Sequence, residues 1–463
     1  MSVAELEQGV FNFTRMDQVV VPFLEAAGEA RVLVDIETSP AWLWEPATAC
    51  QPSLAPCGPD TCADAERTDL SPSTGGGYGN RLRCPHWGDT SVPRDKSWKD
   101  MAAYFARVSD WYTKGGFTAP DATRHESGHH YNISVWEVWN EVNLVREHNL
   151  TKEAYVEYYD AQVAAMQASE GGAVSRFGGP SLAGLTVEGA DEWGAYLLDK
   201  QNHKPSSTPF DDFSFHQYAM CANKSAVGME AAFEQVDGAQ GILALQRMQH
   251  WRDELRPEAA LHLTESGLIC NAPRGCGGGN DYSCYYTDFD ATYWLASGSQ
   301  WLYQYLRSAE AADLATIAQS QILGYPHGYD GLSGEWPCGS MVDWTRTTPG
   351  VGEGVLNAKY WVELLLLERV GRPFSFVATD SPAADHSGAP PDVYVQGLTS
   401  SKGRVVVAIN TKSTQHEVAL AGGKGEQAFT IDLVSGSGPA REHSLTADTV
   451  ALQPFATMFV VWS

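Results

Sequence analysis

Residues 135–141 read Val-Trp-Glu-Val-Trp-Asn-Glu, an apolar, β-branched run that ends in a carboxylate. Residues 261–267, Leu-His-Leu-Thr-Glu-Ser-Gly, repeat this pattern with Glu265. Short apolar runs of this kind are typical of buried strands. Because the strands of a parallel barrel carry functional side chains at their carboxyl ends, these ends meet at one rim. The two stretches therefore predict that Glu141 and Glu265 face the same rim.

Strands and helices alternate around these two stretches. Further strands are predicted at 31–37, 176–182, 210–218 and 315–322, and helices at 11–27, 98–115, 152–170, 191–200, 229–255, 288–309 and 357–367. Two long connections, 45–96 and 324–354, interrupt the alternation. Strands that alternate with helices indicate a parallel sheet with helices on its faces. The sequence thus predicts an α/β fold, a (β/α)8 TIM barrel over residues 1–372.

The pattern changes after Gly371. Short β-rich runs near 393–397, 404–410, 416–420, 429–433 and 457–462 are separated by Gly- and Ser-containing turns, without a helical pattern between them. Several short strands spaced by turns are typical of an antiparallel sandwich. We therefore expect residues 373–463 to form a β-sandwich accessory domain.

Charge excludes some classes of partner. The chain has 31 basic and 57 acidic residues, a net charge of −26. A field of this sign repels nucleic acid and anionic membrane surfaces. The sequence also lacks an apolar run of about 18 residues, the length needed to span a membrane. We expect neither nucleic acid nor a membrane as a partner.

The nine cysteines favour an oxidising compartment. Four lie between Cys50 and Cys84 and three between Cys270 and Cys284, without paired CxxC units or interleaved histidines. This spacing favours local disulfides over a metal site, and disulfides indicate secretion. Four N-glycosylation motifs, at Asn12, Asn132, Asn149 and Asn223, agree with an extracellular location. The first 28 residues carry no secretory leader pattern, so we expect the leader to be absent from this numbering.

Three motifs occur in order along the predicted strands. These are Asn140-Glu141, the sequence His216-Gln-Tyr218, and Thr264-Glu265. In this order, and with the C-terminal sandwich, the chain resembles the clan of (β/α)8 retaining glycoside hydrolases. Within that clan it is most similar to glycoside hydrolase family 39, which includes β-xylosidases and α-L-iduronidases. The resemblance covers most of residues 31–463.

The resemblance implies a role for each motif residue. Glu141 would be the acid/base and Glu265 the nucleophile, the former protonated and the latter charged. Asn140 would contact the sugar 2-hydroxyl, Tyr218 would orient Glu265, and His216 would line the rim. No metal and no cofactor is expected. Three tryptophans in the predicted rim loops are candidates for stacking on sugar rings: Trp42, Trp336 and Trp344.

Strand counting exposes a difference from the clan. The resemblance places the acid/base glutamate on strand 4, yet only the strand at 31–37 precedes Glu141. Strands 1 and 2 are therefore missing from the pattern or rebuilt, and the numbering is expected to begin inside the ancestral domain.

Three functions remain open. The first is a secreted retaining glycosidase that acts on neutral or weakly acidic plant or microbial glycans. The second is a non-catalytic carbohydrate-binding protein on a degenerate barrel, which the missing strands favour. The third, an intracellular transglycosylase, shares the site residues but conflicts with the cysteines and glycosylation motifs.

Overall fold

The computed structural model describes thirteen segments of the chain. These are residues 4–36, 39–45, 92–144, 150–169, 176–185, 189–221, 226–270, 291–320, 322, 341–343, 355–379, 390–436 and 438–462. They divide into two compact units. The first unit takes the described residues up to 216 together with 247–262, and the second takes 217–246 and those from 263 onward.

The α/β part of the chain is built around a six-stranded β-sheet. The strand order is β10-β9-β8-β7-β6-β3, and β3, β6, β7 and β8 pair in parallel. Their bounds are β3 (Leu33–Ile36), β6 (Val135–Val138), β7 (Arg176–Leu182), β8 (Asp212–Cys221), β9 (Ala260–Cys270) and β10 (Leu314–Gln319). Parallel pairing confirms the α/β prediction. The described residues show six strands in this sheet, so the closure of an eight-stranded barrel remains a prediction.

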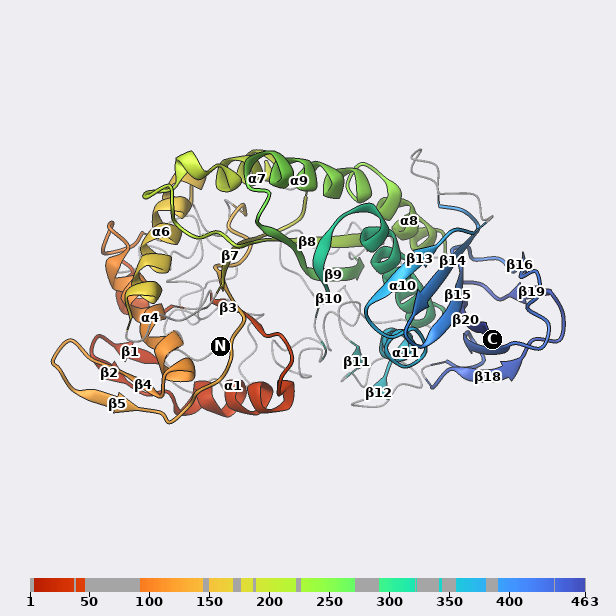
Figure 1. The fold of residues 1–463 in the computed structure, drawn as a ribbon, viewed down its shortest axis with the longest axis horizontal. Coiled ribbons are helices and arrows are strands. Elements are labelled where there is room, and N and C mark those ends of the chain that lie inside the picture. Colours follow the sequence, from red (N-terminus) through yellow and green to blue (C-terminus); the bar gives the residue numbers. More distant parts are fainter. Residues whose placement is uncertain are drawn as a thin grey trace, which may run out of the picture. The chain divides into compact units, whose positions relative to one another are not determined.

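The helices of the first unit are drawn in Figure 1. They are α1 (Thr14–Ala27), α4 (Lys99–Thr113), α6 (Lys152–Ala168), α7 (Ala190–Leu198), the 3-10 turns η1 (Ala41–Leu43) and η4 (Lys200–Asn202), and the later part of α9 (Ile242–Leu255). The side chain of Thr151 caps α6 by accepting a hydrogen bond from the Ala154 amide. Tyr155, Tyr158 and Tyr159 recur at helical spacing and are fully buried. Since burying one large apolar side chain is worth about 1.5–3 kcal/mol, this face holds α6 against the sheet.

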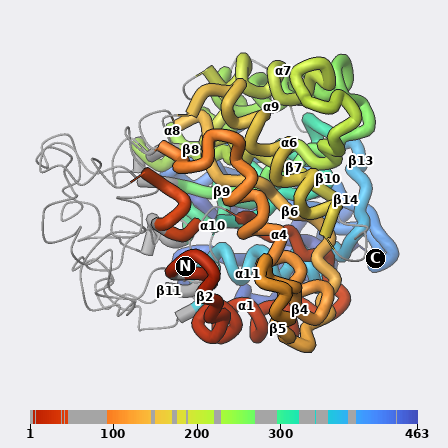
Figure 2. The backbone as a smooth tube through the Cα atoms, turned by 90° about the vertical axis from the view of Figure 1, so that its left-hand side faces the viewer, coloured from red at the N-terminus to blue at the C-terminus, as the bar shows by residue number. Residues whose placement is uncertain are grey.

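Two small hairpins complete the first unit. They are β1 (Glu5–Glu7) with β2 (Val10–Phe11), and β4 (Gly116–Thr118) with β5 (Arg124–Glu126). Phe11 meets Phe117 edge to face, and Phe13 stacks on Trp111 of α4. Figure 2 shows these hairpins beside α1. The sequence pattern predicted neither hairpin, because strands of two or three residues are too short for a period to show.

The second unit contains antiparallel sheets and helices. Its larger sheet has the strand order β13-β14-β15-β20-β17-β18, and β16 and β19 form a separate two-stranded sheet. The strands are β13 (Phe374–Val377), β14 (Val393–Ser400), β15 (Gly403–Asn410), β16 (His416–Ala419), β17 (Gln427–Ile431), β18 (Arg441–Ser444), β19 (Thr449–Leu452) and β20 (Thr457–Trp462). Val418 and Leu452 of the pair share one apolar core with Ala408, Met458 and Val460 of the larger sheet. Antiparallel sheets over a shared core are the arrangement predicted for this segment, and its boundary at residue 373 stays a prediction.

The remaining elements of the second unit are helices and one short hairpin. They are α8 (Ala226–Asp237), the start of α9, α10 (Ala291–Ala311), α11 (Ala358–Leu365), the π-helical turn η6 (Leu366–Val370), and β11 (Val342–Asp343) paired with β12 (Val355–Leu356). No helix among the described residues is both long and apolar enough to cross a membrane.

The prediction of one helix over 229–255 was wrong. The chain instead forms α8 and α9, separated by a turn in which the Gly241 amide bonds the carbonyl of Gly238. A Cβ atom at Gly241 would lie only 1.9 Å from the carbonyl oxygen of Val236. The close backbone approach therefore requires glycine and ends α8.

Candidate functional site

Backbone strain surrounds Glu141 at the end of β6. The strand ends at Val138, and both Trp139 (φ 68°) and Glu141 (φ 50°) adopt the left-handed conformation. Ser181 at the end of the neighbouring β7 does the same (φ 49°), and its carbonyl accepts the Glu141 amide at 2.9 Å. Such conformations cost non-glycine residues of order 1–3 kcal/mol each and cluster at functional sites. The paired strand ends thus fix the backbone from which Glu141 projects.

Glu141 is held by His216. The Nδ1 atom of His216 lies 2.8 Å from Glu141 Oε1 in a hydrogen bond. The His216 side chain is 2% exposed, whereas Glu141 is 24% exposed. The imidazole is therefore a buried support, and the carboxyl group that it bonds remains open to solvent.

Glu265 has a different partner. The hydroxyl of Tyr218 donates a short hydrogen bond to Glu265 Oε2, and both side chains are partly buried. Next to Glu265, the Ser266 hydroxyl donates to the carbonyl of Ala318 on β10 at 2.7 Å. This bond ties the end of β9 to β10. The Tyr218 hydroxyl in turn fixes one oxygen of the Glu265 carboxyl group.

Asn140 and Asn143 serve the loop after β6 in different ways. The Oδ1 atom of Asn140 is buried and has no hydrogen-bond partner within the described residues. Asn143 is fully buried and its Oδ1 accepts the amide of Ala183 at 2.8 Å, which joins the loops after β6 and β7. The sequence analysis missed Asn143, because an asparagine in a loop carries no periodic signal.

The structure places only one of the three predicted tryptophans. The indole nitrogen of Trp42 donates a hydrogen bond to the carbonyl of Glu5 at 2.9 Å. The polar edge of the ring is therefore already bonded within the protein, while the side chain stays partly exposed. Trp336 and Trp344 lie outside the described residues. Trp44, which the sequence analysis did not single out, is buried and meets Trp139 edge to face at 6.0 Å.

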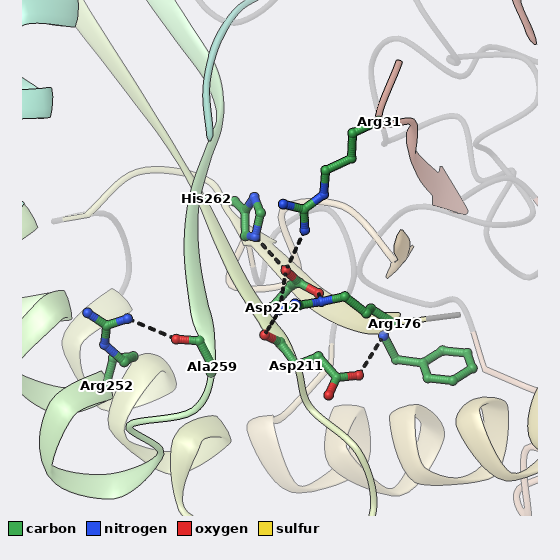
Figure 3. Close-up of polar contacts among 8 residues, drawn as sticks. Arg31, Arg176, Asp211, Asp212, Arg252, Ala259 and His262 are labelled. Carbon is green, nitrogen blue, oxygen red and sulfur yellow. Dashed lines mark hydrogen bonds and ion pairs between the residues drawn. The ribbon is translucent and has the colours of Figure 1, made fainter. Parts of the chain in front are cut away.

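A buried ionic cluster lies at the start of β8, four residues before His216. Asp212 is 1% exposed and accepts hydrogen bonds from Arg176, at 2.8 and 3.0 Å, and from His262, at 2.5 Å (Figure 3). Arg31 reaches the same carboxylate at 3.3 Å. Burial acts to raise the pKa of Asp212, but the hydrogen bonds from His262 and Arg176 outweigh it and lower the pKa. The cluster joins β7, β8 and β9 below the strand ends.

Other predicted features are placed only in part. His125 stacks on Phe117 and His129 stacks on Tyr112, so both rings pack against aromatic side chains of the fold. Asn12 and Asn132 are exposed, as glycosylation requires, while Asn149 and Asn223 lie outside the described residues. The cysteine-rich loops also fall largely outside them, so the disulfides and secretion stay predictions. Glu141 and His216 both carry atoms that can bind a metal ion, and in the first unit these two side chains are hydrogen-bonded to each other.

Comparisons with known proteins give similarity of fold alone. No protein-family model and no curated protein matches the sequence. Solved structures match at low identity, among them CelM2, a bifunctional glucanase-xylanase from a metagenome library (TM-score 0.52, 13% identity, 98% of this chain and 86% of that one). A glucosidase from Croceicoccus marinus matches with a TM-score of 0.51 and 13% identity over 98% and 82% of the two chains. A family GH51 arabinofuranosidase from Xanthomonas axonopodis pv. citri matches with a TM-score of 0.50 and 11% identity over 78% and 73%. These three neighbours are glycoside hydrolases, and the chain shares their fold.

Proposed function

We propose that this chain is a retaining glycoside hydrolase, with Glu141 as the acid/base and Glu265 as the nucleophile. One observation carries the proposal. His216 and Tyr218 lie two residues apart on β8, and each bonds one of the two glutamates. Alternate residues of a strand share a face and are about 6.6–6.8 Å apart. A retaining mechanism uses two carboxyl groups about 5–5.5 Å apart, one as acid/base and one as nucleophile.

The first chemical step would form a glycosyl-enzyme. The Glu265 carboxylate attacks the anomeric carbon while the bond from that carbon to the leaving oxygen breaks. Glu141 donates its proton to the leaving oxygen, so the departing group leaves as an alcohol. In the second step Glu141 takes a proton from water, and the water oxygen displaces Glu265 from the anomeric carbon. Both glutamates return to their starting states.

Neighbouring side chains support these roles. Tyr218 would orient Glu265 through its hydroxyl. The buried Oδ1 atom of Asn140 can accept a hydrogen bond from the sugar 2-hydroxyl, a contact that strengthens as charge develops at the anomeric carbon. Trp42 would offer part of its ring to a sugar at the rim.

The substrate class follows from charge and from the motif trio. The net charge of −26 disfavours polyanionic glycans, so we propose a neutral or weakly acidic plant or microbial glycan. The order Asn140-Glu141, His216-x-Tyr218 and Thr264-Glu265 supports a place near glycoside hydrolase family 39. The cysteines and glycosylation motifs support secretion.

Hydrolysis of a panel of aryl glycosides and polysaccharides tests the proposal. We expect Glu265→Gln to lose turnover of every substrate, because the nucleophile is gone. Glu141→Gln should slow substrates with poor leaving groups by about 10²–10⁴-fold and change good leaving groups far less, because good leaving groups need little protonation. Glu254→Gln removes an exposed glutamate whose ion-pair partner among the described residues is His250, and it serves as the matched control. Wild-type rates in Glu265→Gln would refute the assignment.

The competing function is carbohydrate binding without catalysis. Folded protein that binds glycans but hydrolyses no member of the panel would select this alternative.

A further inference from the structure

The register between β6 and β7 continues past the last residue of β6. Within the strands, Val135 pairs with Arg176 and Glu137 with Gly178, so each pair is offset by 41 positions. Beyond the strand, the Glu141 amide donates to the carbonyl of Ser181 at 2.9 Å. In a parallel ladder this bond places Glu141 opposite residue 182, which has the same offset. The loop that carries Glu141 is therefore still aligned with β7.

One bond of this continued ladder is made by a side chain instead of the backbone. A residue in a parallel ladder donates to the partner strand and also accepts from it. The carbonyl of Glu141 would accept the amide of Ala183, but it accepts the amide of Leu144 at 2.9 Å in a tight turn. The Ala183 amide bonds Oδ1 of Asn143 at 2.8 Å instead. The Asn143 side chain thus stands in for the Glu141 carbonyl.

Asn143 lies in an apolar setting that gives its polar group one clear purpose. Its side chain is fully buried, and the neighbouring Val142 and Leu144 are buried as well. Burying an amide group is costly unless it is hydrogen-bonded. A residue without an acceptor at this position would also leave the amide of Ala183 without its partner. The bond therefore matters to both loops that it joins.

The start of the same loop is anchored too. The hydroxyl of Tyr155, a fully buried residue of α6, donates to the carbonyl of Val138 at 2.6 Å. The amide of Trp139 donates to the carbonyl of Ile36 on β3 at 3.2 Å. Glu141 therefore lies between two fixed points of the backbone. Its left-handed conformation persists because the surrounding bonds enforce it.

We propose that Asn143 is a positioning residue that fixes the backbone of Glu141 and so aims its carboxyl group at the leaving oxygen. This inference rests on the proposed function. His216 holds the carboxyl group itself through Oε1. Asn143 holds the backbone from which that side chain starts. Without the Asn143 oxygen, the Ala183 amide can take the Glu141 carbonyl, which draws Glu141 into a regular ladder and away from its left-handed conformation.

The test compares Asn143→Ala with wild type on two aryl glycosides of one sugar. With a poor leaving group, we expect kcat/KM to fall by about 10–10²-fold, because a displacement of about 1 Å can cost about 10²-fold in rate. The loss should lie in kcat, with KM within about twofold of wild type, because sugar binding is retained. With a good leaving group, kcat/KM should stay within about threefold, because little protonation is needed.

Two further variants separate positioning from general destabilisation. Asn143→Asp keeps an oxygen acceptor and should restore most of the activity toward the poor leaving group. Asn410→Ala is the matched control. It removes an equally buried asparagine of β15, whose Oδ1 accepts the amide of Lys412 at 3.0 Å. This control should lose stability without any selective loss toward poor leaving groups.

Three outcomes of the kinetic test would overturn the inference. The first is an equal loss of kcat/KM for both leaving groups in Asn143→Ala. The second is the same selective loss in Asn410→Ala. The third is a loss in Asn143→Asp as large as that in Asn143→Ala, which would show that the oxygen acceptor is not what matters.

Amide hydrogen exchange tests the bond without any substrate. Selective ¹⁵N-alanine labelling, with Ala183→Gly for assignment, follows the amide of Ala183. This amide should exchange about tenfold or more faster in Asn143→Ala than in wild type, and at the wild-type rate in Asn410→Ala. Unchanged exchange in Asn143→Ala would overturn the inference. Faster exchange, in a protein whose wild type hydrolyses no glycoside, would refute the proposed function and leave the link between the two loops standing.

Discussion

His203 uses both of its ring nitrogens inside the first unit. Its Nδ1 lies 2.7 Å from Asp160 Oδ1, and its Nε2 lies 2.9 Å from the carbonyl oxygen of Leu197. Asp160 also accepts the amide of Lys204 at 2.5 Å. The pair thereby joins α6 to the segment that follows α7.

His203→Ala should lower the free energy of unfolding by about 3–5 kcal/mol, because it leaves the buried Asp160 carboxylate without its main partner. Urea denaturation at neutral pH measures the change. His250→Ala, which breaks a pair whose side chains are 69% and 57% exposed, should stay within about 0.5 kcal/mol of wild type. Equal losses in the two variants would contradict a stabilising role for the buried hydrogen bond between His203 and Asp160.

At this scale the sequence predicted residue types better than their environments. The order of motifs identified Glu141, Glu265, His216 and Tyr218, and the structure pairs them as two hydrogen-bonded couples. Glu137 was not identified, although it shares a quoted stretch with Glu141. Glu137 is buried on β6 opposite Gly178 of β7, and a single sequence does not reveal which residues stand opposite each other in a sheet.

Among the elements, those with a strong period were predicted best. The helix expected at 152–170 is α6, from Lys152 to Ala168, because its tyrosines repeat on one face. The strand expected to reach Glu141 ends at Val138 instead, since left-handed residues follow. The apolar content of the sequence does not mark the end of β6, because Trp139, which follows the strand, is as buried as the strand residues.

The turn between α8 and α9 gives a prediction for one glycine. Gly241→Ala should destabilise the protein by about 1–3 kcal/mol, because the new Cβ meets the carbonyl of Val236 and the backbone must shift. Thermal and urea unfolding would report the loss.

Gly238→Ala is the control for that variant. A Cβ at Gly238 would lie 3.3 Å from the nearest carbonyl oxygen, that of Glu234, so a small adjustment accommodates it. A loss in Gly238→Ala as large as that in Gly241→Ala would show that general flexibility, rather than the close contact, makes the turn sensitive.

For the whole molecule, two buried carboxyl groups give stability opposite dependences on pH. The pKa of Asp212 is lowered on folding, so its contribution is present above the ordinary aspartate pKa and is lost as pH falls through the lowered value. The pKa of Glu137 is raised, so its folded environment favours the protein in acid and costs stability as pH rises above the ordinary glutamate pKa.

Asp212→Asn should therefore be less stable than wild type at neutral pH, and its stability should fall less steeply between about pH 5 and pH 2. Urea denaturation at several pH values measures both effects. Asp100→Asn, which changes an exposed aspartate in the first turn of α4, should keep the wild-type profile. An unchanged acid slope in Asp212→Asn would contradict the role given to the cluster in Figure 3.

The architecture was predicted at the level of layers. Alternating strands and helices gave the parallel sheet, and the change after Gly371 gave the antiparallel sheets. Strand β18 escaped prediction because Arg441, Glu442, His443 and Ser444 are all exposed and present no apolar face.

That same strand forms one edge of the larger antiparallel sheet. An edge strand offers unpaired backbone groups on which a second chain can add, and charged side chains oppose such addition. With ionisable groups at three of its four positions, β18 is a poor template for sheet growth. The charged composition that makes β18 undetectable in a hydrophobicity pattern thus also disfavours fibrous association of the protein in a concentrated solution.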